Sequence, residues 1–207
     1  MPRLVTFVAL GDSLTVGFIP SRLATRPYSQ ILQELTEAFL QASPRPPAVT
    51  VRFFNRGVNG DLTSDMLLRF SRDVLAFQPN YVIILGGTND LGWGLPIEEV
   101  FCHLIQLYEQ ALVHDVEPIA CTVPSVLGWD DGIPLRQTLN RRLQQWCQEK
   151  PLLCVYLFAA TCDHTTRRLR SDYASDGLHF NALGYRKLAE TIFEDAVRRI
   201  LQREASL

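Results

Sequence analysis

The sequence predicts a three-layer α/β/α fold, in which a parallel β-sheet lies between two layers of helices. Two observations predict it. Short, near-continuous apolar runs alternate along the chain with longer segments whose apolar residues recur about every 3.6 positions. No internal repeat, low-complexity segment or long linker interrupts this alternation, so residues 1–207 are expected to form a single domain.

Five apolar runs predict the strands. They are partly β-branched and apolar at nearly every position, as in parallel strands that are covered on both faces of a sheet. The predicted strands are residues 4–10, 49–54, 81–85, 116–122 and 152–158. The stretch Ser-Pro-Arg-Pro-Pro at 43–47 is rich in residues that break secondary structure and predicts a loop before the second strand.

Helical periodicity between the strands supplies the outer layers. Residues 96–114 place an apolar stripe on one helix face, and Pro96 suits the first helical position. The members of this stripe are Ile97, Val100, Phe101, Leu104, Ile105, Tyr108 and Leu112. A last helix carries a second stripe opposite Arg and Glu residues, formed by Leu188, Ile192, Phe193, Val197, Ile200 and Leu201.

Composition excludes several classes of protein. The chain is 47% hydrophobic and 20% charged, as ordinary globular proteins are, and its formal net charge of −2 argues against nucleic-acid binding. The basic clusters at 140–142 and 167–170 are short and lie among acidic residues, so we interpret both as solvated helix faces.

The N-terminal apolar run, residues 4–10, is too short to span a membrane and lacks the cleavage pattern of a signal peptide. We therefore expect a cytoplasmic protein without stable membrane insertion. The five cysteines are odd in number and contain no Cys-x-x-Cys pair. This usage favours buried, reduced thiols over disulfides or a zinc site.

Residues that suggest chemistry follow the predicted strands. They are Gly11-Asp12-Ser13, the segment Asn-Arg-Gly-Val-Asn-Gly-Asp at 55–61, Gly-Gly-Thr-Asn-Asp at 86–90 and Ser-Asp-Gly-Leu-His at 175–179. In parallel α/β sheets, ligands bind outside the carboxyl ends of the strands. The sequence therefore predicts one site, assembled from four loops at a single edge of the sheet.

Ser13 fits two roles in this site. It is a candidate nucleophile, which would need an adjacent base to accept its proton, or it is a residue that caps the following helix. The Gly-x-Ser-x-Gly elbow of α/β-hydrolases is not matched, because Thr15 stands two positions after the serine.

Four histidines are candidates for the base. His103 and His114 lie on a predicted helix, and His164 has Asp163 directly beside it, where adjacent side chains seldom point the same way. His179 follows Asp176 by three positions in a glycine-containing loop. A tight turn would bring that carboxylate onto the imidazole and fix its tautomer. The same stretch also reads as a helix entry capped by Asn181.

Acyl transfer also requires donors for the developing oxyanion. Candidates are the backbone N–H of Ser13, the backbone N–H of Gly60 and the side-chain amide of Asn89. Gly60 is equally suited to a turn with positive φ, and Asn89 to an Asx-turn, while Asp90 suits a cap or a brace of the loop.

In order and context, Ser13, Gly60, Asn89 and His179 resemble the signature of the SGNH hydrolases, also called the GDSL family of lipases and esterases. The resemblance runs from the first strand to the last helix. It implies a flavodoxin-like sandwich with strand order 2-1-3-4-5, with Ser13 as nucleophile, His179 as base and Asp176 as its orienting carboxylate. Ser13, Gly60 and Asn89 would form the oxyanion hole.

The sequence departs from the family pattern in two places. Phe180 replaces the proline that many members carry after the histidine, which bears on the stiffness of the loop. Asn59 stands where relatives often have serine, and we assign it no catalytic role.

The function we expect is hydrolysis of a small-molecule carboxylic ester through an acyl-enzyme on Ser13, without a metal or an organic cofactor. Phe18, Trp93 and Trp129 lie in loops near the predicted site and are candidates for the substrate pocket. Such apolar loops favour short or medium acyl chains. The protein is expected to be a monomer or a small homo-oligomer.

Two rival functions stay open at this stage. A flavodoxin-type module would bind a phosphate or a flavin at the helix after the first strand. A non-catalytic binding protein would keep the hydrolase fold without its reaction. The first leaves the segments at 86–90 and 175–179 unexplained, and the complete set of Ser13, Asp176 and His179 argues against the second, because a binding module does not need all three.

Overall fold

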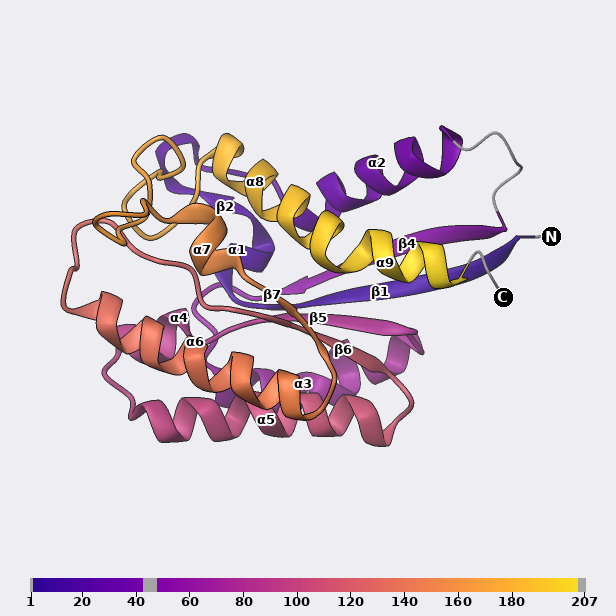
Figure 1. Cartoon of the computed structure of the whole chain (residues 1–207), viewed down its shortest axis with the longest axis horizontal. Helices are drawn as coiled ribbons and strands as arrows, with labels where there is room; N and C mark the ends of the chain where they lie inside the picture. The colour runs from indigo at the N-terminus through magenta and orange to yellow at the C-terminus, as the bar shows by residue number, and fades with distance from the viewer. Residues whose placement is uncertain (1, 43–47, 205–207) are drawn as a thin grey trace.

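The computed structural model describes residues 2–42 and 48–204, so the predicted loop at 43–47 lies outside the described residues. A five-stranded parallel sheet runs through the centre of the molecule (Figure 1). Its strands are β1 (Arg3–Gly11), β4 (Val49–Gly57), β5 (Tyr81–Leu85), β6 (Glu117–Cys121) and β7 (Leu153–Val155). They lie in the order β4-β1-β5-β6-β7, which confirms the predicted order 2-1-3-4-5.

Helices cover both faces of the sheet (Figure 1). The helices α2 (Tyr28–Gln41), α8 (Ala182–Ile192) and α9 (Arg198–Glu204) lie on one face, and a π-helical turn, η3 (Phe193–Val197), joins the last two. The helices α3 (Thr63–Asp73), α5 (Ile97–Val113) and α6 (Gly132–Glu149) lie on the other face. The 3₁₀ turn η2 (Leu75–Phe77) follows α3.

Short elements occupy the end of the sheet where the strands finish. The helices α1 (Ser13–Val16), α4 (Thr88–Gly92) and α7 (Leu157–Thr161) follow β1, β5 and β7. After α1 comes a small hairpin of β2 (Phe18–Ile19) and β3 (Ala24–Thr25), with the 3₁₀ turn η1 (Pro20–Arg22) between them.

The sheet separates two hydrophobic cores. Because side chains alternate along a strand, Phe7 and Ala9 of β1 enter the core under α2 and α8, whereas Val8 and Leu10 enter the core over α3 and α5. Phe7 stacks on Phe53 and Tyr81 of the neighbouring strands. Near-continuous apolar strands are therefore buried on both sides, as the sequence predicted.

The predicted fifth strand at 152–158 is wrong in its second half. The strand ends at Val155, and α7 begins at Leu157. The hydroxyl of Thr122, one residue beyond β6, accepts the backbone N–H of Phe158 at 3.0 Å and satisfies a donor in the first turn of α7. An apolar run does not reveal such a partner from a distant segment, so it cannot locate this boundary.

Two further predictions need correction. Leu112, which the periodicity predicts on the apolar stripe of α5, is exposed, whereas Leu107 and Ala111 of the same helix are buried. The clusters at 140–142 and 167–170 are not both solvated helix faces. Asn140 is buried and exchanges two hydrogen bonds with the backbone of Val123, and 167–170 lies in a loop.

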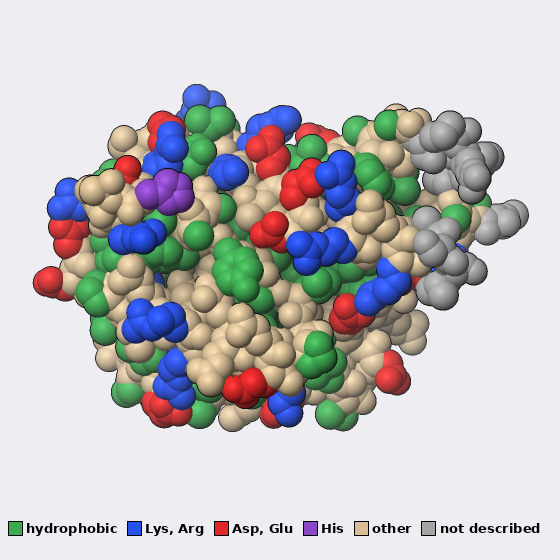
Figure 2. Space-filling view, viewed as in Figure 1, with side chains coloured by type: hydrophobic (Ala, Val, Ile, Leu, Met, Phe, Trp, Pro, Cys, Tyr) green, Lys and Arg blue, Asp and Glu red, His purple; other side chains and the backbone are tan. Residues whose placement is uncertain are grey.

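The surface carries a mixture of basic and acidic side chains, in agreement with the formal net charge of −2. On the face seen in Figure 2, Lys and Arg side chains lie among Asp and Glu. Within residues 2–42 and 48–204, no helix has the length and hydropathy needed to cross a bilayer. The five cysteines are free thiols, of which Cys121, Cys147 and Cys162 are buried.

Candidate active site

The four suggestive loops meet at the carboxyl ends of β1, β4 and β5. Gly11 is the last residue of β1 and pairs in register with Gly57 on one side and Leu85 on the other. The chain therefore leaves three neighbouring strands at the same level, and the first turns of α1 and α4 start from that edge (Figure 1).

Ser13 opens α1, and the residue that caps this helix is Asp12. The Asp12 carboxylate accepts the Leu14 N–H at 2.8 Å, and Gly17 closes the four-residue helix in a left-handed conformation. The interpretation of Ser13 as a cap is thus wrong, and its hydroxyl is free for another partner. Gly11 permits the tight turn, since a Cβ there would lie 2.2 Å from the Thr15 hydroxyl.

That partner is His179, 166 residues further along the chain. Ser13 Oγ lies 2.9 Å from His179 Nε2, and His179 Nδ1 lies 2.8 Å from Asp176 Oδ2. A carboxylate only accepts, so Nδ1 carries the proton and Nε2 is left as the acceptor for the serine hydroxyl. Phe18 packs edge-on against the imidazole, with ring centroids 5.4 Å apart.

The Asp176 side chain also builds the turn that carries His179. Its Oδ1 accepts the backbone N–H groups of Leu178 and His179 at 3.0 and 2.7 Å. Burial alone would raise the pKa of Asp176, but these hydrogen bonds and the imidazole outweigh it and hold the pKa below its usual value. Asp176 is therefore an anion at neutral pH.

The residues after His179 anchor the turn to the core. Phe180 is fully buried and packs on Tyr185, so a hydrophobic anchor stands where many relatives have proline. Asn181 caps α8 through its bond from the Gly184 N–H at 3.0 Å, as predicted. The helix entry and the Asp176–His179 pair coexist in this stretch.

The other histidines have different surroundings. His103 Nδ1 lies 3.1 Å from the Thr63 hydroxyl, and His114 Nδ1 lies 2.8 Å from its own helix carbonyl at Gln110. Asp163, beside His164, uses one carboxylate oxygen to accept from Thr165 and Thr166. Among the described residues, His179 is therefore the only one of the four histidines that lies within hydrogen-bond range of Ser13.

The candidate oxyanion donors lie on two loops that are joined to each other. Gly60 has a φ of +82°, and within the described part of the chain no group accepts its N–H. Asn89 donates one amide hydrogen to the Asp61 carbonyl at 2.9 Å. No described residue accepts its second amide hydrogen, so both Gly60 and Asn89 can donate to a substrate oxygen. Asp90 braces the loop by accepting from the N–H and hydroxyl of Thr63.

A cavity of about 420 Å³ lies beside Asn89 and Asp176. Two of the three predicted pocket residues, Trp93 and Trp129, line it, whereas Phe18 contacts His179 instead. The other lining residues are Thr88, Gly92, Val126, Leu127, Gly128, Arg136, Gly177 and Leu178. Trp93 is 78% exposed, which leaves a large aromatic surface at the rim.

Arg136 is a pocket residue that the sequence reasoning missed. It is fully buried on α6, donates to the Pro124 and Gly132 carbonyls at 3.1 Å, and lies against the Trp129 ring. Burial lowers the pKa of its guanidinium to about 10. The sequence does contain one indication that Arg136 is buried, because it lies three residues before Leu139 on the apolar stripe of α6.

Comparison with known proteins points to one family. The model of the GDSL-like lipase/acylhydrolase family matches residues 9–187 of the chain. The acetylxylan esterase of Geobacillus stearothermophilus is 26% identical over 161 residues, which cover 72% of this chain and 74% of the esterase. The crystal structure of the lipase/acylhydrolase from Enterococcus faecalis is 25% identical, with a TM-score of 0.75 and 96% coverage of both chains.

A further relative is similar over a shorter span. The uncharacterized lipoprotein YqeF of Bacillus subtilis is 33% identical over 128 residues, which cover 58% of this chain. They amount to 49% of YqeF, so the similarity extends over about half the length of that relative.

Proposed function

The chain belongs to the GDSL-like lipase/acylhydrolase family and is a GDSL-type esterase, and from this premise we propose that it cleaves esters through an acyl-enzyme on Ser13. The observation that carries the proposal is the continuous chain of hydrogen bonds from Ser13 Oγ through the His179 ring to Asp176. This is the arrangement that activates a serine hydroxyl at neutral pH.

Acylation follows from the geometry. Ser13 Oγ attacks the ester carbonyl while its proton passes to His179 Nε2, and the Asp176 carboxylate stabilises the imidazolium that forms. Negative charge develops on the carbonyl oxygen, and the N–H groups of Ser13 and Gly60 and the Asn89 amide donate to it. When the tetrahedral intermediate collapses, the C–O bond breaks and His179 returns its proton to the leaving alcohol.

Deacylation repeats these steps with water. His179 takes a proton from a water molecule as the water oxygen attacks the carbonyl carbon of the acyl group bound to Ser13 Oγ. The second tetrahedral intermediate occupies the same oxyanion donors. Its collapse releases the carboxylic acid, and His179 returns the proton to Ser13 Oγ. Apart from the ester and this water molecule, the cycle uses only groups of the chain itself.

The cavity beside Asn89 supports a preference for short or medium acyl chains. Its volume of about 420 Å³ lies near the lower end of the range for small-molecule sites, which is roughly 300–1,000 Å³. Trp93, Trp129 and Leu127 give it apolar walls. Acetyl and butyryl esters should fit such a space more readily than a palmitoyl ester does.

Hydrolysis of p-nitrophenyl esters from acetate to palmitate tests the proposal, with the Ser13→Ala protein as the matched control. We expect a maximum at acetate to hexanoate and a loss of at least about 10³-fold in kcat in the variant, because the nucleophile is removed. Activity that persists in Ser13→Ala would exclude the acyl-enzyme. A maximum at palmitate would exclude the assigned acyl pocket.

A further inference from the structure

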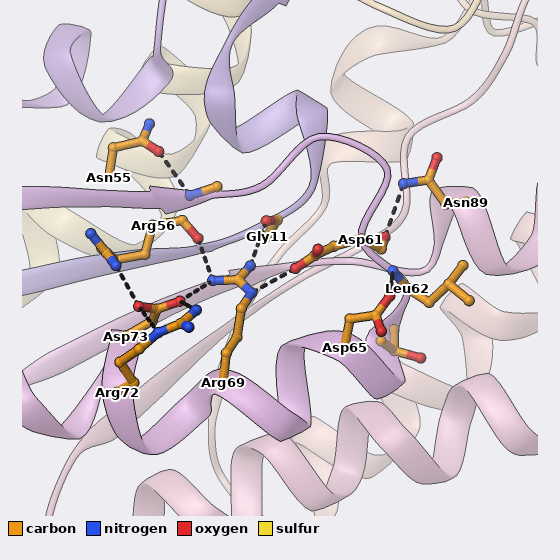
Figure 3. A network of polar contacts seen from close by, with 12 residues as sticks. Gly11, Asn55, Arg56, Asp61, Leu62, Asp65, Arg69, Arg72, Asp73 and Asn89 are labelled. Carbon is orange, nitrogen blue, oxygen red and sulfur yellow. Dashed lines mark hydrogen bonds and ion pairs between the residues drawn. The ribbon is translucent and has the colours of Figure 1, made fainter.

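One buried guanidinium contacts several backbone segments around the active site (Figure 3). Arg69, on α3, is 7% exposed. Its Nε donates to Asp61 Oδ2 at 2.6 Å, and its Nη2 donates to the Gly11 carbonyl at 3.0 Å. Its Nη1 donates to the Arg56 carbonyl at 2.8 Å and to Asp73 Oδ2 at 3.0 Å.

These acceptors belong to the segments that carry the oxyanion donors. Gly11 ends β1 two residues before Ser13, and Asp61 directly follows Gly60. The Asp61 carbonyl in turn accepts the Asn89 amide at 2.9 Å (Figure 3). Ser13, Gly60 and Asn89 come from three different strand ends, and the Arg69–Asp61 pair is connected to all three.

The bond from Asn89 to Asp61 determines where the second amide hydrogen points. A side-chain amide is planar and carries two N–H groups, so fixing one of them fixes the direction of the other. A shift of the Asp61 backbone would therefore misalign Asn89 and Gly60 together. Preorganisation of such donors, without reorientation during the reaction, is what makes an oxyanion hole effective.

We propose that Arg69 is a positioning residue of this esterase, which holds the Gly60 N–H and the Asn89 amide in register with Ser13 through its bonds to Asp61 and to the end of β1. The inference rests on the proposed function, since it assigns Arg69 to the oxyanion hole of that reaction. Arg69 itself does not touch the substrate.

The residue type follows from the geometry of the acceptors. Four acceptors from four residues surround one planar guanidinium, and a lysine ammonium has only three donors and no rigid fork. Two carboxylates, Asp61 and Asp73, compensate the buried charge. Asp73 also accepts from Arg72, whose side chain is 72% exposed and bonds to no other residue in the described part of the chain.

This neighbour offers a matched control. Arg69→Lys and Arg72→Lys both keep a cation beside Asp73, but only Arg69→Lys disturbs the bonds around Asp61 and Gly11, because three ammonium donors cannot serve all four acceptors of Arg69. We expect Arg69→Lys to lower kcat about 10- to 100-fold with KM within about twofold, because donors that act in the transition state are displaced. Arg72→Lys should retain wild-type kcat. Equal effects of the two variants would overturn the proposal.

A second variant covers the case in which Arg69→Lys does not fold. Asp61→Asn keeps the backbone carbonyl that binds Asn89 and removes the carboxylate that pairs with Arg69. We expect a loss in kcat of about tenfold in a protein that melts cooperatively. Wild-type kcat in Asp61→Asn would show that the pair has no positioning role.

A double-mutant cycle identifies the route of the effect. If Arg69 and Asp61 act through the oxyanion hole, Asp61→Asn should cost less than about threefold when Asn89→Ala is already present. Full additivity would overturn the proposal. A failure of the proposed function would be seen separately, in the variants of the site itself. Wild-type activity in Asn89→Ala would show that hydrolysis does not use this oxyanion hole, and wild-type activity in Ser13→Ala would show that it does not use this nucleophile. In either case Arg69 would have no such reaction to support.

Discussion

Replacing Asp176 by asparagine should reverse the tautomer of His179. In the wild type, Asp176 Oδ2 accepts the proton on His179 Nδ1 at 2.8 Å, so Nε2 faces Ser13 without a hydrogen. An asparagine retains one oxygen for the N–H groups of Leu178 and His179 and therefore keeps the turn. Its NH₂ group would then face Nδ1, which favours the tautomer protonated on Nε2, and that nitrogen cannot take the proton of Ser13.

Two contributions set the size of the effect. A hydrogen bond from the imidazolium to a carboxylate contributes about 1.5–3 kcal/mol, and restoring the reactive tautomer against a facing donor costs about 1–3 kcal/mol. Because the Asp176 side chain is 39% exposed, water softens both contributions. We therefore expect the activation free energy to rise by about 4 kcal/mol. At 1.36 kcal/mol per tenfold, this corresponds to a decrease of about 10³-fold in kcat.

The assay is steady-state hydrolysis of p-nitrophenyl acetate at pH 7.5. Asp172→Asn is the matched control, since Asp172 lies in the same loop and pairs with Arg170 instead of a histidine. That variant should retain wild-type activity, and both variants should melt within a few degrees of the wild type. More than a tenth of wild-type kcat in Asp176→Asn would refute the role that the geometry assigns to this carboxylate.

Two other predictions concern stability and the shape of the loops. Burial raises the pKa of Asp12 from 3.8 to about 7, so the folded state retains a proton that the unfolded chain has released, and stability should fall as pH rises between these values. Asp12→Asn cannot titrate and serves as the reference in urea unfolding at pH 5 and pH 8. Between these pH values the wild type should lose about 3 kcal/mol of stability relative to Asp12→Asn, which is two pH units, from pH 5 to the pKa of about 7, at 1.36 kcal/mol per unit. Parallel changes in the two proteins would contradict the prediction. Gly177→Ala should destabilise the protein by about 1–3 kcal/mol and reduce kcat, because φ is +92° and the new Cβ would lie 2.5 Å from the Leu127 carbonyl. Thermal melting and ester hydrolysis measure both effects, and an unchanged melting temperature would contradict the expected clash.

The sequence alone determined the sheet and the edge at which the site lies. Runs such as Tyr81–Leu85 are apolar at every position because both faces of this strand are buried, and the structure places the strand at those bounds. Asp176 and His179 were also predictable as a pair, since they lie three residues apart around a glycine that permits a tight turn.

Long-range partners decided what the sequence left open. The fifth strand ends at Val155, and the Thr122 hydroxyl accepts the Phe158 N–H in the first turn of α7, whereas the apolar run itself continues through this boundary. Ser13 is bound to His179 and is not the cap of α1, because the fold brings residues 166 positions apart into contact. Local patterns contain neither of these contacts.

Buried charge was the feature that only the tertiary structure revealed. Arg69 and Arg136 lie on helices whose sequences also suit a solvated position, and both are buried. Arg69 donates to carbonyls and carboxylates of several segments, and Arg136 donates to the Pro124 carbonyl and to the Gly132 carbonyl of its own helix. The sequence sets which residues can donate and accept. Whether a given arginine exchanges water for those partners depends on how the strand ends and loops converge, and that is a property of the packed fold.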